Sequence, residues 1–247
     1  VSVGLASGTY LIMTPPTEDQ LEAALPHLRT AADLRGDRLP EILVQQNDML
    51  SFYAGQFFLN PERKKWTLTL IAALYEAVVV PEMQVKLMCS LPRPIDFTEQ
   101  VQPIIATPAT SAWPSGHATE AFAFATILSA LEFAANGTAS TGAGIVAALT
   151  AREPKVALPF RLAARIADNR TIAGVHFPAD SAHGALLGFS TAISFVALCQ
   201  GVQASVPTWN ADGGAWDSYF TLDRWIAALP GWLQSNLIVP AGSGGTL

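Results

Sequence analysis

Cationic, hydroxyl and imidazole side chains recur at fixed spacings in the middle of the chain, and together they could bind and attack an oxyanion. They lie in three short segments: Lys86-x6-Arg93-Pro94, Pro114-Ser115-Gly116-His117 and Arg170-x5-His176-x3-Asp180. A helix that begins at Ser115 directs unpaired backbone N–H groups, a hydroxyl and the His117 imidazole at one spot, with the positive end of the helix dipole behind them. The pattern therefore predicts a site for a tetrahedral or trigonal-bipyramidal oxyanion.

The three segments, in this order, resemble the motifs of the superfamily that joins vanadium-dependent haloperoxidases to type-2 phosphatidic acid phosphatases and bacterial class A acid phosphatases. The resemblance runs from Lys86 to Asp180. It is specific because the three motifs occur together, whereas any one alone would be weak. It implies an enzyme whose site holds phosphate or vanadate.

The resemblance implies that five residues hold the anion. Lys86, Arg93 and Arg170 would bind its equatorial oxygens, arginine with a planar fork and lysine as a point charge. Ser115 would add a hydroxyl and Gly116 a backbone N–H, because glycine lets the backbone approach closely. The alternative, three ordinary surface charges, is disfavoured because only 14 lysines and arginines occur in the chain and these three keep the family spacing.

Two histidines and an aspartate would carry out the chemistry in this resemblance. His176 would be axial, attacking phosphorus in a phosphatase or ligating vanadium(V), as the one metal ligand, in a haloperoxidase. Asp180 would accept the other ring N–H of His176 and so fix its tautomer. His117 would exchange protons on the opposite side of the anion. His27 and His183 receive no role.

The anchor residues do not separate the two activities, because vanadate imitates the transition state of phosphoryl transfer. Residues 104–119 and 173–181 resemble haloperoxidase sequences. We therefore predict a vanadate-dependent haloperoxidase that oxidises halide with hydrogen peroxide, with Lys86 polarising the bound peroxide. The alternative is a soluble phosphomonoesterase, an acid phosphatase, that forms a phosphohistidine at His176. A protein that only holds the anion is disfavoured by the two histidines.

Three positions depart from the haloperoxidase pattern. Thr110 stands where an aromatic residue or histidine is usual, Met83 replaces a tryptophan and Asn169 replaces a serine. Iodide or bromide is therefore expected as the halide in preference to chloride.

Helical patterns surround these motifs, and no alternating strand pattern persists. Thr17 begins a capping box, Pro81 should kink or restart a helix, and Ser115 should cap another. The expected helices are 17–34, 40–60, 61–90, 118–135, 154–169, 178–199 and 216–229, with one short helix within 138–153. The sequence thus predicts an all-α, soluble multi-helix bundle of the haloperoxidase and acid phosphatase type.

The length of 247 residues favours one domain. Its expected parts are an irregular lead-in (1–16), a catalytic helical core (17–200), and C-terminal helices with a tail (201–247) whose last residues, 241–247, are frayed. Two cysteines far apart in sequence, Cys89 and Cys199, are interpreted as thiols.

The composition of the chain limits the kinds of partner that it is expected to bind. The net charge of −6 argues against nucleic acid or an anionic membrane surface. Two apolar runs, 118–135 and 182–199, contain charged or polar residues and are interpreted as buried helices, so no membrane span is expected. The remaining partners are hydrogen peroxide and halide, or a phosphomonoester, and a second copy of the chain. The resemblance implies a secreted or periplasmic setting.

Overall fold

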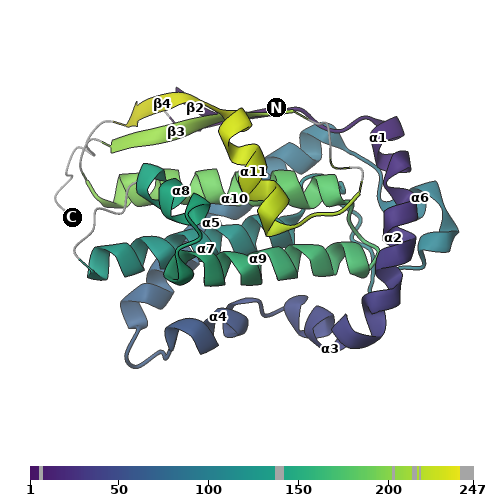
Figure 1. Cartoon of the computed structure of the whole chain (residues 1–247), viewed down its shortest axis with the longest axis horizontal. Helices are drawn as coiled ribbons and strands as arrows, with labels where there is room; N and C mark the ends of the chain where they lie inside the picture. Colours follow the sequence, from purple (N-terminus) through teal and green to yellow (C-terminus); the bar gives the residue numbers. More distant parts are fainter. Residues whose placement is uncertain (6–7, 137–141, 202–203, 213–215, 217, 240–247) are drawn as a thin grey trace.

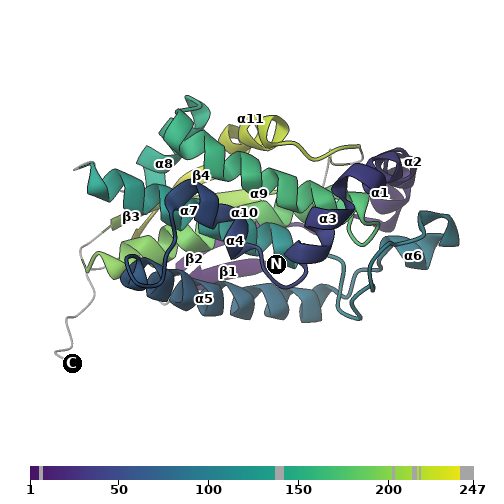
Figure 2. The same cartoon turned by 90° about the horizontal axis from the view of Figure 1, so that it is seen from below.

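The computed structural model of the chain describes residues 1–5, 8–136, 142–201, 204–212, 216 and 218–239. Long helices run side by side through the middle of the molecule, and a sheet covers one side of them (Figure 1). Shorter helices from the N-terminal part cover the opposite side and one end, as the view from below shows (Figure 2).

Thirteen helical segments lie in the described part of the chain. In order they are α1 (Glu18–Ala23), α2 (Leu25–Ala31), η1 (Ala32–Leu34), α3 (Arg35–Gln45), α4 (Leu50–Phe57), α5 (Lys65–Cys89), α6 (Pro94–Phe97), η2 (Glu99–Val101), α7 (Gly116–Ala135), α8 (Gly142–Thr150), α9 (Pro154–Ile172), α10 (Pro178–Cys199) and α11 (Leu222–Trp232).

A mixed sheet of four strands joins the two ends of the chain. The strands, in their order across the sheet, are β1 (Ser2–Leu5), β2 (Gly8–Met13), β3 (Ala204–Ala211) and β4 (Leu233–Val239). The central pair, β2 and β3, is parallel and the two outer pairs are antiparallel. The sheet packs on α10, where the Tyr10 and Thr191 hydroxyls lie 3.0 Å apart and the rings of Phe189 and Trp209 lie 5.9 Å apart.

The prediction of an all-α fold is therefore wrong. Two strands occupy the region expected as an irregular lead-in, and two others occupy the region expected to hold only C-terminal helices and a tail; residues 241–247 lie outside the described part. The strands escaped notice for a physical reason. They are short, and β2 buries Tyr10, Leu11 and Met13 without strict alternation. Its parallel partner, β3, lies near the other end of the chain, so the local sequence does not mark this pairing.

The prediction of a soluble bundle without membrane spans is also wrong. Three helices are long and apolar enough to cross a membrane: Lys65–Phe97, Gly116–Ala135 and Pro178–Cys199. The first was missed because Pro81 was expected to kink or restart the helix, whereas α5, 25 residues long, continues through that proline. The other two are the apolar runs that were assigned to the core.

The three candidate spans differ in how much of their surface the protein covers. Within the most apolar window, 83% of the third helix and 67% of the second are buried inside the protein, against 28% of the first. Exposed apolar side chains therefore gather on α5, where Trp66, Leu87 and Met88 are each more than 70% exposed.

Several local predictions are confirmed. Thr17 forms the capping box of α1, Ser115 caps α7 and Ser90 ends α5 in the left-handed conformation. The helix expected over 17–34 is divided into three segments, and α3 begins at Arg35, where a break was expected. The predicted end of the 118–135 helix is confirmed, since α7 ends at Ala135 and Asn136 caps it.

The close packing of α7 on α10 depends on glycine. A Cβ at Gly188 would overlap the carbonyl oxygen of Thr119, so the two backbones would have to separate. We expect Gly188→Ala to lower the free energy of unfolding by about 3 kcal/mol, measured by chemical denaturation. The control is Gly55→Ala in α4, where a Cβ meets nothing within 4 Å. It should raise stability by about 0.5 kcal/mol. Equal effects of the two changes would contradict this account.

Candidate active site

The predicted site residues meet where the last turns of α5 and α9 approach the first turns of α7 and α10 (Figure 1). Ser115 lies at this junction and is fully buried. Its backbone N–H donates to the Asp180 carbonyl at 2.9 Å, which joins the starts of α7 and α10. Its hydroxyl accepts from the Ala118 N–H at 3.5 Å and so caps α7.

Lys86 reaches the same junction from the last turn of α5. Its Nζ donates to the carbonyl oxygens of Ser111 at 3.0 Å and Pro114 at 2.6 Å, and the residue is only 5% exposed. An ammonium group carries three N–H donors. The two carbonyl groups therefore hold the buried charge in place and leave one donor for an anion.

Arg93 follows α5 in an extended conformation. Its backbone N–H donates to the Asp96 carboxylate at 2.7 Å. Its guanidinium donates from Nε to the Thr110 carbonyl at 2.9 Å, from Nη2 to the Thr110 hydroxyl at 3.3 Å, and from Nη1 to the Val175 carbonyl at 2.9 Å. Thr110, which departs from the haloperoxidase pattern, thus helps to orient this arginine.

Two hydrogen bonds determine the tautomer of His176. Its Nδ1 lies 3.0 Å from Asp180 Oδ2, which also accepts from the Phe177 backbone N–H at 2.8 Å. Its Nε2 lies 3.1 Å from Arg93 Nη1. Because the guanidinium can only donate and the carboxylate can only accept, the ring carries its proton on Nδ1 and presents the Nε2 lone pair.

The cations surround His176 closely enough to change its protonation. Burial lowers its pKa well below the usual value, and nearby charges lower it further; these belong to Arg93, Lys86, His117 and Arg170. A cationic imidazole is disfavoured in such surroundings. His176 is therefore neutral at neutral pH, as a nucleophile or ligand must be.

Arg170 lies in the last turn of α9 and is 1% exposed. Its Nη2 donates to Gln45 Oε1 at 3.0 Å and to the Ile42 carbonyl at 3.3 Å. Its Nε and Nη1 are buried without a hydrogen-bond partner. Burial lowers its pKa to about 10, so the guanidinium stays charged at neutral pH.

Gln45, at the end of α3, was missed by the sequence analysis. Its Oε1 accepts from both Arg170 and the Asn169 side chain, each at 3.0 Å, and its backbone carbonyl lies 3.0 Å from His117 Nε2. One residue thus positions two predicted site residues. Nothing in the local sequence singles it out, because it lies more than 70 residues before either of them.

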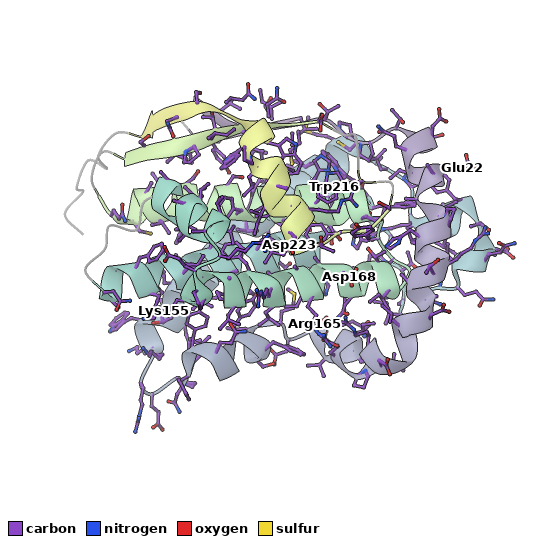
Figure 3. All side chains as sticks on the ribbon, viewed as in Figure 1. Glu22, Lys155, Arg165, Asp168, Trp216 and Asp223 are labelled. Atoms are coloured by element: carbon purple, nitrogen blue, oxygen red, sulfur yellow. The ribbon has the colours of Figure 1, made fainter. Side chains whose placement is uncertain are left out.

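A salt bridge holds α3 against α9 near Gln45. Arg165 leaves α9 on the side that faces α3 (Figure 3), and its Nε donates to Glu41 Oε2 at 2.8 Å. Glu41 precedes Gln45 by one helical turn. The pair therefore helps to keep the α3 end beside Arg170.

Glu82 is a second residue that the sequence analysis missed. A Cβ at Gly116 would lie 2.5 Å from Glu82 Oε1, so this carboxylate packs directly against the start of α7. Glu82 is 5% exposed, and its Oε2 is buried without a hydrogen-bond partner. Its position four residues before Lys86 on the same helix was the available signal, since such residues share one face.

The arrangement fits a tetrahedral oxyanion. The Glu82 carboxylate fills the space that a Cβ at Gly116 would take. The unpaired guanidinium N–H groups of Arg170 and the Lys86 ammonium group lie near His176, whose Nε2 accepts from Arg93. Such donors match phosphate or vanadate in charge and shape. Within the described residues, no group of three His, Cys, Asp or Glu side chains could hold a metal ion.

Substitution of Arg170 tests anion binding directly, because its buried Nε and Nη1 have no hydrogen-bond partner in the protein. Arg170→Lys keeps the charge and loses the planar fork, so we expect phosphate and vanadate to bind about 10-fold to 100-fold more weakly by calorimetry. The matched control is Arg161→Lys on the exposed side of α9. It should leave both affinities unchanged, and equal losses in the two variants would refute the assignment.

Comparison with known proteins identifies the family. The family model of the PAP2 superfamily matches residues 64–203, which include all three motifs. The comparison with curated proteins gives no match. Members of this superfamily are typically enzymes, phosphatases and haloperoxidases among them, so the match supports phosphoesterase-type or haloperoxidase-type chemistry at a phosphate-binding site. The chain belongs to the PAP2 superfamily.

Proposed function

We propose that this protein hydrolyses phosphomonoesters through a phosphohistidine at His176. The observation that carries the proposal is the orientation of His176, whose Nε2 lone pair faces the guanidinium of Arg93 while Asp180 holds the other ring nitrogen. A phosphate group held by Arg93, Arg170 and Lys86 would present its phosphorus to this nitrogen. The cations would then neutralise the charge of the transition state.

In the first step, His176 Nε2 gives its electron pair to phosphorus, and the bond from phosphorus to the ester oxygen breaks. His117 donates a proton to the leaving oxygen. In the second step, His117 takes a proton from water, the water oxygen bonds to phosphorus, and the phosphorus–nitrogen bond breaks. His117 Nε2 donates to the Gln45 carbonyl at 3.0 Å, so the proton that passes to the leaving oxygen is carried on Nδ1 of the cationic ring. The negative charge of a bound phosphate would favour this cation, and the neutral ring left after the first step then accepts the proton of water on Nδ1.

Hydrolysis is preferred because a cavity lies beside His117. Its volume is about 250 Å³, and His117 forms part of its wall. An alcohol that leaves opposite His176 would enter this space. The cavity thus provides a place for the organic part of a phosphomonoester.

A vanadate-dependent haloperoxidase is the second candidate, favoured by the segments 104–119 and 173–181. The residues present fit vanadate as well as phosphate: Arg170 Nε and Nη1 lack partners, and His176 offers a neutral nitrogen. Bound vanadate would supply activation of hydrogen peroxide toward iodide or bromide. In that case Lys86 and Arg93 would hold the anion, and His117 would exchange protons with it.

One paired assay separates the two activities. Half of a batch, free of vanadate, is given an aryl phosphate; the other half, stripped of phosphate and loaded with orthovanadate, is given hydrogen peroxide with iodide, bromide or chloride. We expect phosphate release that vanadate inhibits, that falls at least about 1,000-fold in His176→Ala, and only trace halogenation. Halogenation that requires vanadate and His176, without hydrolysis, would reverse the assignment.

A further inference from the structure

The cavity beside His117 has its own chemical character. It is formed by the link between α3 and α4 together with residues of α5 and α7. Its walls are Gln45, Gln46, Asn47, Asp48, Met49, Leu50, Tyr75, His117, Glu120 and Phe124. The site described above uses His117 and Gln45 of this set, and leaves the others without a function.

Two acidic side chains line the cavity. Glu120 follows His117 by three residues, so both side chains lie on one face of α7. Asp48 contributes a second carboxylate from the α3–α4 link. Among the described residues that line the cavity, none is a lysine or arginine. Burial raises the pKa of Glu120 to about 8, and the charge of Glu82 contributes to this rise. A cation in the cavity would therefore favour the ionised form of Glu120.

Two aromatic rings lie beside Glu120. The rings of Tyr75 and Phe124 stack with their centroids 6.4 Å apart and an angle of 30° between their planes. Tyr75 is 40% exposed, and the nearby charge of Glu120 raises the pKa of its hydroxyl. Aromatic faces and a carboxylate are the groups that bind ammonium ions in proteins.

Gln45 lines the cavity and also contacts Arg170, and its side chain gives independent evidence for a ligand between the cavity and the anion site. Because its Oε1 accepts from Arg170 and Asn169, its Nε2 points elsewhere, and this nitrogen is buried without a partner. Gln45 is 1% exposed, so water does not satisfy the amide from bulk solvent. An oxygen of a bound ester could accept from it.

We propose that the cavity receives a cationic leaving group, so that the preferred substrates are phosphomonoesters of amino alcohols or quaternary ammonium alcohols. This inference rests on the proposed phosphatase activity. The phosphate of such a zwitterion lies among Lys86, Arg93 and Arg170, and its ammonium group lies between Glu120 and the ring of Tyr75. The reaction itself is unchanged: the phosphorus–oxygen bond breaks and the alcohol departs with a proton.

The test compares two esters of the same shape. Choline phosphate carries a trimethylammonium group, and 3,3-dimethylbutyl phosphate carries a neutral tert-butyl group in its place. We expect kcat/KM to be about 10-fold higher for choline phosphate. In Glu120→Gln this ratio should fall toward one, and in Asp48→Asn it should fall partly. Glu76→Gln, an exposed carboxylate of α5 outside the cavity, should leave the ratio within twofold.

Equilibrium binding of both esters to His176→Ala separates the two proposals. Tighter binding of choline phosphate by about 10-fold supports the cationic pocket, whether or not the wild-type protein hydrolyses either ester. Hydrolysis of both esters with equal kcat/KM and equal affinity would overturn this inference and leave the phosphatase proposal standing. Absence of binding, or preference for the neutral ester, would also overturn it. If Glu120→Gln misfolds, the kcat/KM ratio of the two esters in Asp48→Asn and the comparison of their affinities still test the cationic pocket.

Discussion

Three cationic side chains buried at one point are the constraint on which the rest of the structure depends. Lys86, Arg93 and Arg170 are each at most 5% exposed, and their charges act together on His176. Burying charge without compensation is costly. Backbone carbonyl groups provide part of the compensation, and the unpaired Nε and Nη1 of Arg170 show that it is incomplete. A bound oxyanion would complete it.

The helices satisfy this constraint through the ends that they bring together. Lys86 and Arg170 lie in the last turns of α5 and α9, where the helix dipole favours positive charge. The first turns of α7 and α10 bring the Ser115 cap and the Asp180 carboxylate to the same end of the molecule (Figure 1). Close packing of α7 on α10 then fixes the distance between the two helix starts. The sheet lies away from this junction and supports α10 from its other side.

Features that depend on neighbouring residues could be predicted from the sequence, whereas contacts between distant segments could not. The cap at Ser115 and the order of the three motifs are short-range features, and the structure places all the motif residues around His176. Gln45 acts through contacts made only in the folded protein, so its sequence neighbours do not mark it. Glu82 stands one helical turn before Lys86, and this spacing was a signal that the sequence did carry. The sheet joins strands from opposite ends of the chain. Pro81 was expected to kink or restart the helix because it lacks an N–H, whereas it lies inside the continuous α5.

The central claim is that His176 Nε2 attacks phosphorus, and trapping the covalent product tests it most directly. The protein is mixed with a radiolabelled phosphomonoester, quenched with base within one turnover, and the bound phosphate is located by mass spectrometry. We predict up to one phosphate per chain on His176, stable in base and labile in acid, and none in His176→Ala. Hydrolysis that continues without any phosphate on His176, or that survives in His176→Ala, would contradict the account.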